Sequence, residues 1–477
     1  MKSLLILANV MLVAALTQQS AGQFNDPPQS GPTCGTDVAM AKMSNEQKSL
    51  MTASAVAAQS DELLLYINFN PNGSVVRSGF GNADTLTTPL VSGQRFCPAP
   101  LLDEAQRDEI VRLVSDDYSP FNIRVTTDAA EFAAHPRQTK QMVLITTVAS
   151  VIGHSSSTGG VSPFSGLGLR LPGDFAFVFS SAYGNDPRSV AAVVSHESGH
   201  FLGLGHQHLF TDTCGFLSEY HGGFGSGPLS FNPLMGDGTG EGISNWFAQS
   251  CPSPTFGLPQ NDYELINSQV VVRPDDFPDE PEGSVVEGTE ISGVLEGSGD
   301  ADLIKINFRN PGPVVITSDN IDLKVSLLNP GGRVMAEFND PGSTDVTIPF
   351  ARGMKYLKIE AASNENMSAE FMTGTYHVSY GFFSDLLAFF DASAANGSLT
   401  GVGSGGVAQL RLNLMRLTLV IAGELIEEGR LDLACFALRT AHQFADGAAQ
   451  PDDLVTGAAR PELADRIQDL QALLGCL

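Results

Sequence analysis

The chain has 477 residues, of which 42% are hydrophobic and 17% charged, and it carries a formal net charge of −27. This length predicts about two to four folded domains. The excess of negative charge excludes a general electrostatic attraction to nucleic acid or to an anionic membrane. It is typical of a soluble extracellular protein, and the many carboxylates make calcium a candidate cofactor.

An apolar run near the N-terminus predicts an export signal. Lys2 precedes the stretch LLILANVMLVAAL, and small and polar residues follow it. The apolar stretch of thirteen residues is too short to span a membrane. Residues 1–22 are therefore expected to be a signal peptide. Since no later segment reaches spanning length, we expect a secreted, extracellular protein that does not insert into a membrane after cleavage.

Residues 23–60 begin with a loop-like, proline-bearing stretch and form an N-terminal segment that is a candidate pro-segment. Strands and helices then alternate over residues 61–272. β-Branched and aromatic runs predict strands at 62–69, 121–127, 141–148 and 174–181. The amphipathic stretch 101–118 predicts a helix between the first two of them. This order predicts a mixed α/β sheet with crossover helices.

The second half of the chain predicts a linker and two further domains. Residues 273–290 are acidic and proline-bearing and resemble an interdomain linker. Short strands with turn residues between them are predicted at 301–308, 312–318, 323–338, 345–350, 354–361 and 374–380. They predict an all-β sandwich, which together with the linker spans 273–383. Apolar residues three and four apart then predict a small all-α domain over 384–477, and among them are Leu410, Leu414, Leu417 and Ile421.

Six cysteines in an exported chain favour disulfide bonds. Six cysteines allow fifteen pairings, so the connectivity is not fixed by spacing. Their distribution along the chain favours the sequential pairs Cys34–Cys97, Cys214–Cys251 and Cys435–Cys476. A bond between the last two cysteines would stabilise the small helical domain by about 4 kcal/mol.

The stretch HESGHFLGLGHQH, residues 196–208, holds four of the nine histidines of the chain. Asn185 or Asp186 can cap a helix that leads into it. His196 and His200 are four residues apart, so their imidazoles project from one face of this helix, about one turn from each other. This is the separation that two ligands of one tetrahedral zinc ion require.

A third ligand requires the helix to end. Gly203 can adopt the left-handed conformation at little cost, which ends the helix and returns His206 toward the metal. Glu197 lies beside the first ligand, where it can face water at the metal without binding the metal. His208 competes with His206 for the third position. Otherwise we expect His208 and His221 at the rim of the cleft or on the surface.

The complete string H-E-x-x-H-x-x-G-x-x-H resembles the motif of the metzincin zinc endopeptidases. The family spacing favours His206 over His208. The resemblance implies a metzincin catalytic domain over 61–272, with one catalytic zinc ion held by His196, His200 and His206. It implies that Glu197 activates a zinc-bound water for peptide hydrolysis. Protein or peptide substrates would lie extended along an edge strand, for which 159–172 is the candidate rim.

Metzincins also have a methionine turn beneath the metal. The stretch FNPLMGDG offers Met235 for this turn. Some subgroups place a tyrosine two residues later, whereas this chain has Asp237 there. Tyr220 is therefore a candidate donor to the oxyanion of the transition state.

Two further resemblances concern the remainder of the chain. FNPLMG, SNW and PQNDYELI are similar to segments of exported bacterial metzincins, and DDFPDEPEGS through GTYHVSY resembles the pre-peptidase C-terminal domain of secreted bacterial proteases. The second resemblance implies an accessory role in secretion, folding or attachment. The accessory domains are thus expected to contact substrate or the cell surface.

The segment PTCGTD, residues 32–37, leaves two readings of Cys34 open. Its Cys-Gly setting resembles the cysteine switch by which several metzincin precursors block their metal site. Thr33 stands where that switch usually has arginine, and a switch would leave Cys97 unpaired. A Cys34–Cys97 disulfide is the other reading.

These features favour a secreted zinc metalloendopeptidase. The alternative is a non-catalytic surface-binding protein that keeps a metzincin fold with a structural zinc ion. Structural zinc sites usually have four protein ligands, whereas this motif offers three and keeps the base Glu197. Zinc-dependent hydrolysis of a bond other than a peptide bond also stays open.

Overall fold

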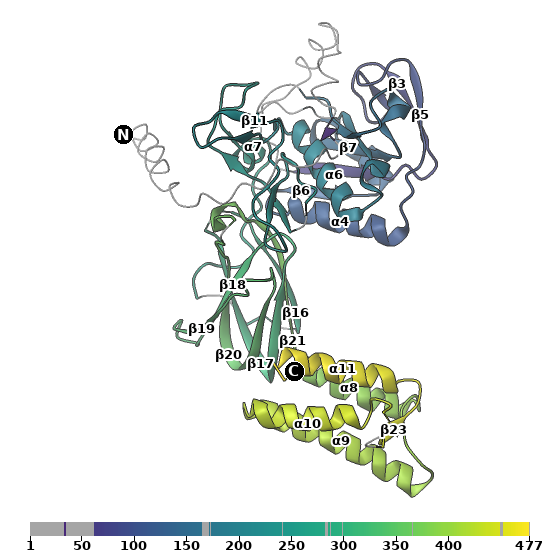
Figure 1. The fold of residues 1–477 in the computed structure, drawn as a ribbon, viewed down its shortest axis with the longest axis vertical. Coiled ribbons are helices and arrows are strands. Elements are labelled where there is room, and N and C mark those ends of the chain that lie inside the picture. Colours follow the sequence, from purple (N-terminus) through teal and green to yellow (C-terminus); the bar gives the residue numbers. More distant parts are fainter. Residues whose placement is uncertain are drawn as a thin grey trace.

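The computed structural model describes residues 33–34, 62–164, 171, 173–240, 242–281, 285–286, 288–297, 299–364, 366–448 and 452–476. The predicted signal peptide and nearly all of the N-terminal segment 23–60 lie outside the described residues. Figure 1 shows three regions in chain order from top to bottom: a mixed α/β domain, an antiparallel β domain and a group of C-terminal helices.

The α/β domain is built on one six-stranded sheet. Its strands are, in spatial order, β1 (Thr33–Cys34), β8 (Thr158–Val161), β9 (Phe175–Phe179), β7 (Lys140–Thr146), β2 (Leu63–Asn68) and β6 (Ile123–Thr126). The neighbours from β9 to β6 run parallel, while β8 runs antiparallel to β9. The predicted mixed sheet and its four predicted strands are confirmed.

Two long helices of this domain begin where the sequence supplies caps. α4 (Glu104–Asp117) starts at a capping box between Asp103 and Gln106. α6 (Pro187–Phe201) starts at Asp186, whose side chain accepts a hydrogen bond from the Ser189 N–H. α6 is buried from Val190 to Phe201 and contacts α4, β7, β8 and β9. The helix that carries the histidine motif is therefore a central core element.

Shorter elements complete the α/β domain. They are β3 (Ser74–Ser78), β4 (Thr87–Thr88), β5 (Gln94–Cys97), α5 (Ala129–Ala134), β10 (Leu209–Phe210), β11 (Phe216–Ser218), β12 (Phe231–Pro233), β13 (Ile243–Asn245), β14 (Ala248–Gln249), β15 (Gln260–Asn261) and α7 (Asp262–Gln269). The strands from β10 to β15 lie in the region that follows the histidine motif and form three two-stranded sheets.

The β domain is sandwich-like. Its antiparallel strands are, in spatial order, β16 (Glu290–Leu295), β21 (Gly374–Tyr380), β17 (Ala301–Thr317), β20 (Val346–Ala361), β18 (Leu323–Leu328) and β19 (Val334–Phe338). The predicted division of 301–318 and of 345–361 into separate strands is wrong. The pairing of β17 with β20 shifts register between Phe308 and Val314. Such an irregularity bends a strand without ending it, so β17 continues past the prolines in this stretch.

Four C-terminal helices pack around their own core: α8 (Phe382–Ala395), α9 (Gly406–Glu427), α10 (Leu431–Gln443) and α11 (Arg460–Leu473). The residues of α9 in this core include Met415, Leu419, Ala422 and Ile426. The stretch with apolar residues three and four apart is helical as predicted. However, Leu410, Leu414, Leu417 and Ile421 lie on the exposed side of α9. Across the described residues, none of the helices is both long and apolar enough to cross a membrane.

The α/β and β domains share a continuous interface. Leu229, Phe231 and Ile243 belong to the same hydrophobic cluster as the core of the β domain. Beside it, the buried Asp117 accepts hydrogen bonds from Ser195 Oγ, 2.5 Å away, and from Asn320 Nδ2, 3.0 Å away. This polar contact joins the residue before His196 to the β domain.

Two of the three predicted disulfides are confirmed: Cys214–Cys251 and Cys435–Cys476. Both are compatible with an extracellular protein. Cys97 is a free, buried thiol, so the Cys34–Cys97 pairing is wrong. Burial raises the pKa of the Cys97 thiol to about 11, which leaves it protonated at neutral pH.

Replacement of both Cys435 and Cys476 by serine should destabilise the helical domain. The bond spans 41 residues of sequence, and its loss should cost about 4 kcal/mol of unfolding free energy. Thermal scans by circular dichroism should show the helical transition at least about 10 °C lower. The matched double variant at Cys214 and Cys251 should leave this transition in place, and equal effects of the two pairs would contradict the assignment.

Candidate metal centre

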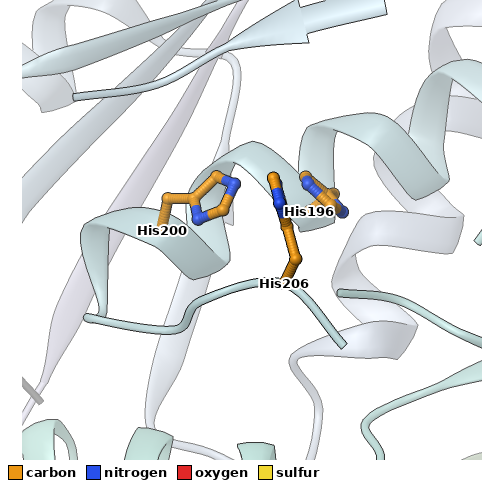
Figure 2. Close-up of side chains that lie close together, drawn as sticks. All are labelled: His196, His200 and His206. Carbon is orange, nitrogen blue, oxygen red and sulfur yellow. The ribbon is translucent and has the colours of Figure 1, made fainter. Parts of the chain in front are cut away.

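Three histidine rings converge at the C-terminal end of α6. The ring centroids of His196 and His200 are 4.9 Å apart, and His206 lies 5.3 Å and 5.0 Å from them. One ring nitrogen of each lies within 4.8 Å of those of the other two. Figure 2 shows two rings that project from the helix and a third that rises from the returning chain to meet them. The spacing predicted from the sequence therefore brings these three side chains together.

The return of the chain depends on Gly203. The helix ends at Phe201, and Gly203 has a φ of +82°. The Leu204 N–H then donates to the Gly199 carbonyl, 3.1 Å away, which closes the turn. Glycine adopts this left-handed conformation without a steric penalty. The predicted end of the helix is confirmed.

Each of the three rings is oriented through its Nδ1 atom. His196 Nδ1 donates to the Leu234 carbonyl at 2.7 Å, and His200 Nδ1 donates to the Leu204 carbonyl at 2.8 Å. His206 Nδ1 donates to Glu219 Oε1 at 3.2 Å. With the proton on Nδ1, the Nε2 atom of each neutral ring carries the lone pair that a metal requires. Three neutral imidazole nitrogens are a donor set that fits a zinc ion. All three histidines are also buried.

Met235 lies in a turn beneath the helix, at the position of the predicted methionine turn. It is fully buried, and a Cβ atom placed on Gly199 would lie 2.5 Å from Met235 Sδ. The Met235 carbonyl accepts a hydrogen bond from the Gln207 N–H at 2.8 Å. The turn thus contacts both the helix and the returning chain that carries His206.

Glu197 on α6 is fully buried against β8. A Cβ atom placed on Gly160 would lie 2.3 Å from Glu197 Oε1, so only glycine lets the strand pass this closely. β8 forms the start of the predicted substrate rim 159–172. Within that rim, residues 165–170 and 172 lie outside the described residues.

The outer edge of β8 is paired with the N-terminal segment. β1 runs parallel to β8, with Thr33 opposite Thr158 and Cys34 opposite Gly160. The backbone of Cys34 is therefore placed beside the glycine that contacts Glu197.

Tyr220 lies beside the histidines. Its ring centroid is 4.7 Å from that of His206 and 6.5 Å from that of His196. Asp237 does not take the place of a tyrosine donor, because its Oδ1 accepts a hydrogen bond from Thr239 Oγ1 at 2.6 Å.

The expected position of His208 and His221 at the rim or surface is wrong, since each is only 5% exposed. His208 Nδ1 donates to the Glu219 carbonyl at 2.7 Å. The His221 ring packs 4.4 Å from that of Phe224, and burial lowers the pKa of His221 to about 4. Both are structural residues of the loops that follow the motif.

Two acidic residues at this site were not found by sequence reasoning. Glu219 orients His206, and only its proximity to Tyr220 in sequence hinted at a role. The buried Asp262 accepts hydrogen bonds from Gln207 Nε2 at 2.7 Å and Gln260 Nε2 at 2.8 Å. Burial raises the pKa of Asp262 to about 7, against the effect of these hydrogen bonds. Asp262 thereby anchors the chain directly after His206.

Comparison with known proteins gives little information about the fold or the function of this chain. No family model matches the chain, and no curated protein matches it. One similar solved structure is the pre-peptidase C-terminal domain of a collagenase from Bacillus anthracis, at 21% sequence identity and a TM-score of 0.15. The match covers 19% of this chain and 86% of that chain. A match at this TM-score supports no inference about fold or function.

Replacement of Glu219 by alanine should weaken metal binding, because it removes the acceptor that orients His206. Loss of such a partner typically costs about 10- to 100-fold in metal affinity. Zinc affinity measured by competition with a chromogenic chelator would show this loss. Glu219→Gln keeps an acceptor and should restore most of the affinity, while the exposed Glu264→Ala should have no effect. Equal affinities of all variants would contradict this role of Glu219.

Proposed function

We propose that this chain is a secreted zinc-dependent metalloendopeptidase of the metzincin type. The observation that carries the proposal is the convergence of His196, His200 and His206 beside a buried Glu197 that is not one of the three. In the described part of the chain this group offers three protein ligands, whereas structural zinc sites usually have four. A zinc ion held there supplies Lewis acidity, which acidifies water and polarises a carbonyl oxygen.

The residues of the chain have distinct parts in this reaction. Glu197 accepts a proton from the attacking water and delivers it to the nitrogen of the leaving amine. Its burial between α6 and β8 keeps bulk water away from the carboxylate. We propose that Tyr220, whose ring lies beside that of His206, donates a hydrogen bond to the oxyanion.

Substrate would bind as an additional strand on the outer edge of β8, in place of the N-terminal segment. Gly160 keeps this strand close to Glu197, so an extended peptide on β8 would present its carbonyls to the metal centre. The same edge is paired with β1 in the unprocessed chain. We therefore propose that the N-terminal segment blocks the substrate position, with the Cys34 thiolate as a fourth ligand of the metal.

We propose that the accessory regions serve secretion, folding or attachment and take no part in catalysis. The sandwich-like β domain is proposed to be a pre-peptidase C-terminal type domain, which contacts substrate or the cell surface. The two disulfides support an extracellular location.

Replacement of Glu197 by alanine should abolish cleavage of casein while zinc stays bound. Loss of the general base should lower kcat/KM by about 100- to 10,000-fold. Zinc content by atomic absorption should stay near that of the wild type, since Glu197 is not among the ligands. The exposed Glu264→Ala serves as the control and should cleave normally. If wild type binds zinc and cleaves nothing after removal of the N-terminal segment, the non-catalytic surface-binding function takes its place.

Replacement of Cys34 by alanine should activate the unprocessed chain. Without the thiolate, the precursor should cleave casein before any N-terminal processing, whereas the wild-type precursor should be latent. Cys97→Ala removes a buried thiol outside the proposed switch and should leave latency unchanged. Equal activity of wild-type and Cys34→Ala precursors would exclude the switch without affecting the assignment of Glu197.

A further inference from the structure

The long helix α9 of the helical domain has two apolar faces. Its inner face lies in the core of this domain, where Met415, Leu419, Ala422 and Ile426 are 0% exposed. A second row of apolar side chains lies on the outer side of the helix, at exposures between 43% and 68%. We call this row the apolar stripe, and it consists of Val407, Leu410, Leu414, Leu417 and Ile421.

Such a row is exceptional in this protein. Among the described helices, only α10 also exposes large apolar side chains, and these are Leu433 and Phe436. Because α10 packs directly against α9, both helices of this hairpin leave apolar side chains in solvent. Single exposed apolar residues are normal on a protein surface, whereas contiguous apolar patches mark interaction sites.

The spacing of the apolar stripe fits a second helix. Its members are three, four, three and four residues apart, which is the heptad pattern of helices that pack lengthwise on each other. The stripe is about 21 Å long, since a helix rises by about 1.5 Å per residue. Two heptads are too few to stabilise an isolated pair of helices, but α9 is already folded on its own core. A second helix would therefore bind to a preformed surface.

The apolar stripe lies in a segment of α9 that contains no acidic residue. Over residues 406–423 the only charged side chains are Arg411 and Arg416. Arg416 pairs with Asp391 at 2.7 Å, while Arg411 Nη1 donates to the Val402 carbonyl at 3.4 Å. Although the chain has a net charge of −27, two copies can therefore approach here without carboxylates that face each other. The same net charge, with only two basic residues on α9, disfavours an anionic membrane as the occupant.

Charge also favours one direction of packing. Glu424, Glu427 and Glu428 gather at the C-terminal end of α9, whereas its first turn has no acidic residue. A parallel pair would place the two acidic ends side by side. An antiparallel pair separates them and places each beside the N-terminus of the other helix, where the helix dipole favours negative charge. A two-fold axis near Leu414, the middle of the stripe, gives this arrangement.

We propose that two copies of this chain associate through α9, with the apolar stripe of one copy packed antiparallel on the stripe of the other. The helical domain and the α/β domain lie at opposite ends of the molecule (Figure 1), so this contact stays clear of the histidine site in each copy. Five half-exposed side chains offer less than the roughly 800 Å² that each partner gives to a standard interface, so we expect a reversible dimer of micromolar affinity. Since the β domains are proposed to attach to substrate or the cell surface, the dimer would attach at two points and with higher avidity.

Sedimentation velocity of the full chain tests this proposal. The chain carries Glu197→Ala against self-cleavage and one equivalent of zinc, and it is measured across the micromolar range. The parent should shift from one chain to two as its concentration rises. The double variant Leu414→Lys/Leu417→Lys should stay monomeric over the same range, because the contact would bury like charges. Its thermal transition in circular dichroism should match that of the parent, since both side chains are exposed in the monomer.

Leu258→Lys is the matched control, because Leu258 is also exposed but lies outside the helical domain. This variant should dimerise as the parent does. A parent that stays monomeric throughout, or a double lysine variant that still dimerises, would overturn the proposal. If the monomeric parent instead floats with phosphatidylcholine vesicles, a membrane occupies the stripe and the proposal is equally wrong.

Engineered cysteines test the direction of packing, in a Cys34→Ala background. Val407→Cys mixed with Ile421→Cys should form a disulfide-linked dimer under mild oxidation, because these positions meet at the ends of an antiparallel stripe. Val407→Cys alone should not link to a second copy of itself. The reverse pattern would show a parallel pair and contradict the proposed arrangement. None of these outcomes depends on whether the histidine site is catalytic.

Discussion

The candidate metal centre depends on one backbone conformation, the left-handed turn at Gly203. In a continuous helix each residue advances by about 100°, so a residue ten positions after His196 would point about 280° around the axis from it. His206 would then lie on another face of the helix. The φ of +82° at Gly203 ends the helix, and the chain returns with His206 facing the two earlier rings. A side chain at this position would cost about 1–2 kcal/mol for the same conformation.

Once the rings converge, their orientation comes from parts of the chain that are distant in sequence. The Leu234 carbonyl and Glu219 hold two of the Nδ1 atoms, and the Met235 carbonyl holds the returning chain. The helix itself is tied to the β domain through Ser195, Asp117 and Asn320. Because the interface is buried and shares one hydrophobic cluster, the β domain is part of the scaffold that positions α6.

Helices, strands and helix ends were predicted correctly where a single local sequence signal determines them. The cap at Asp186, the left-handed Gly203 and the strands of the α/β sheet are of this kind. The continuity of β17 was not predicted, since a proline-bearing irregularity looks like a strand end. The apolar repeat from Leu410 to Ile421 predicts a helix but not which of its faces packs against the core. In the structure the opposite face of the helix packs there. Glu219 reaches His206 only through the path of a loop, which leaves no periodic signal.

The three histidines and the buried carboxyl groups of Glu296 and Asp302 differ in what their burial demands. Neutral imidazoles whose Nδ1 atoms are hydrogen-bonded can be buried at modest cost, so the three histidines can converge without a metal ion. The carboxylates of Glu296 and Asp302 have no such option, because burial and mutual repulsion act against their charged forms. Burial therefore favours the protonated forms of these two carboxyl groups.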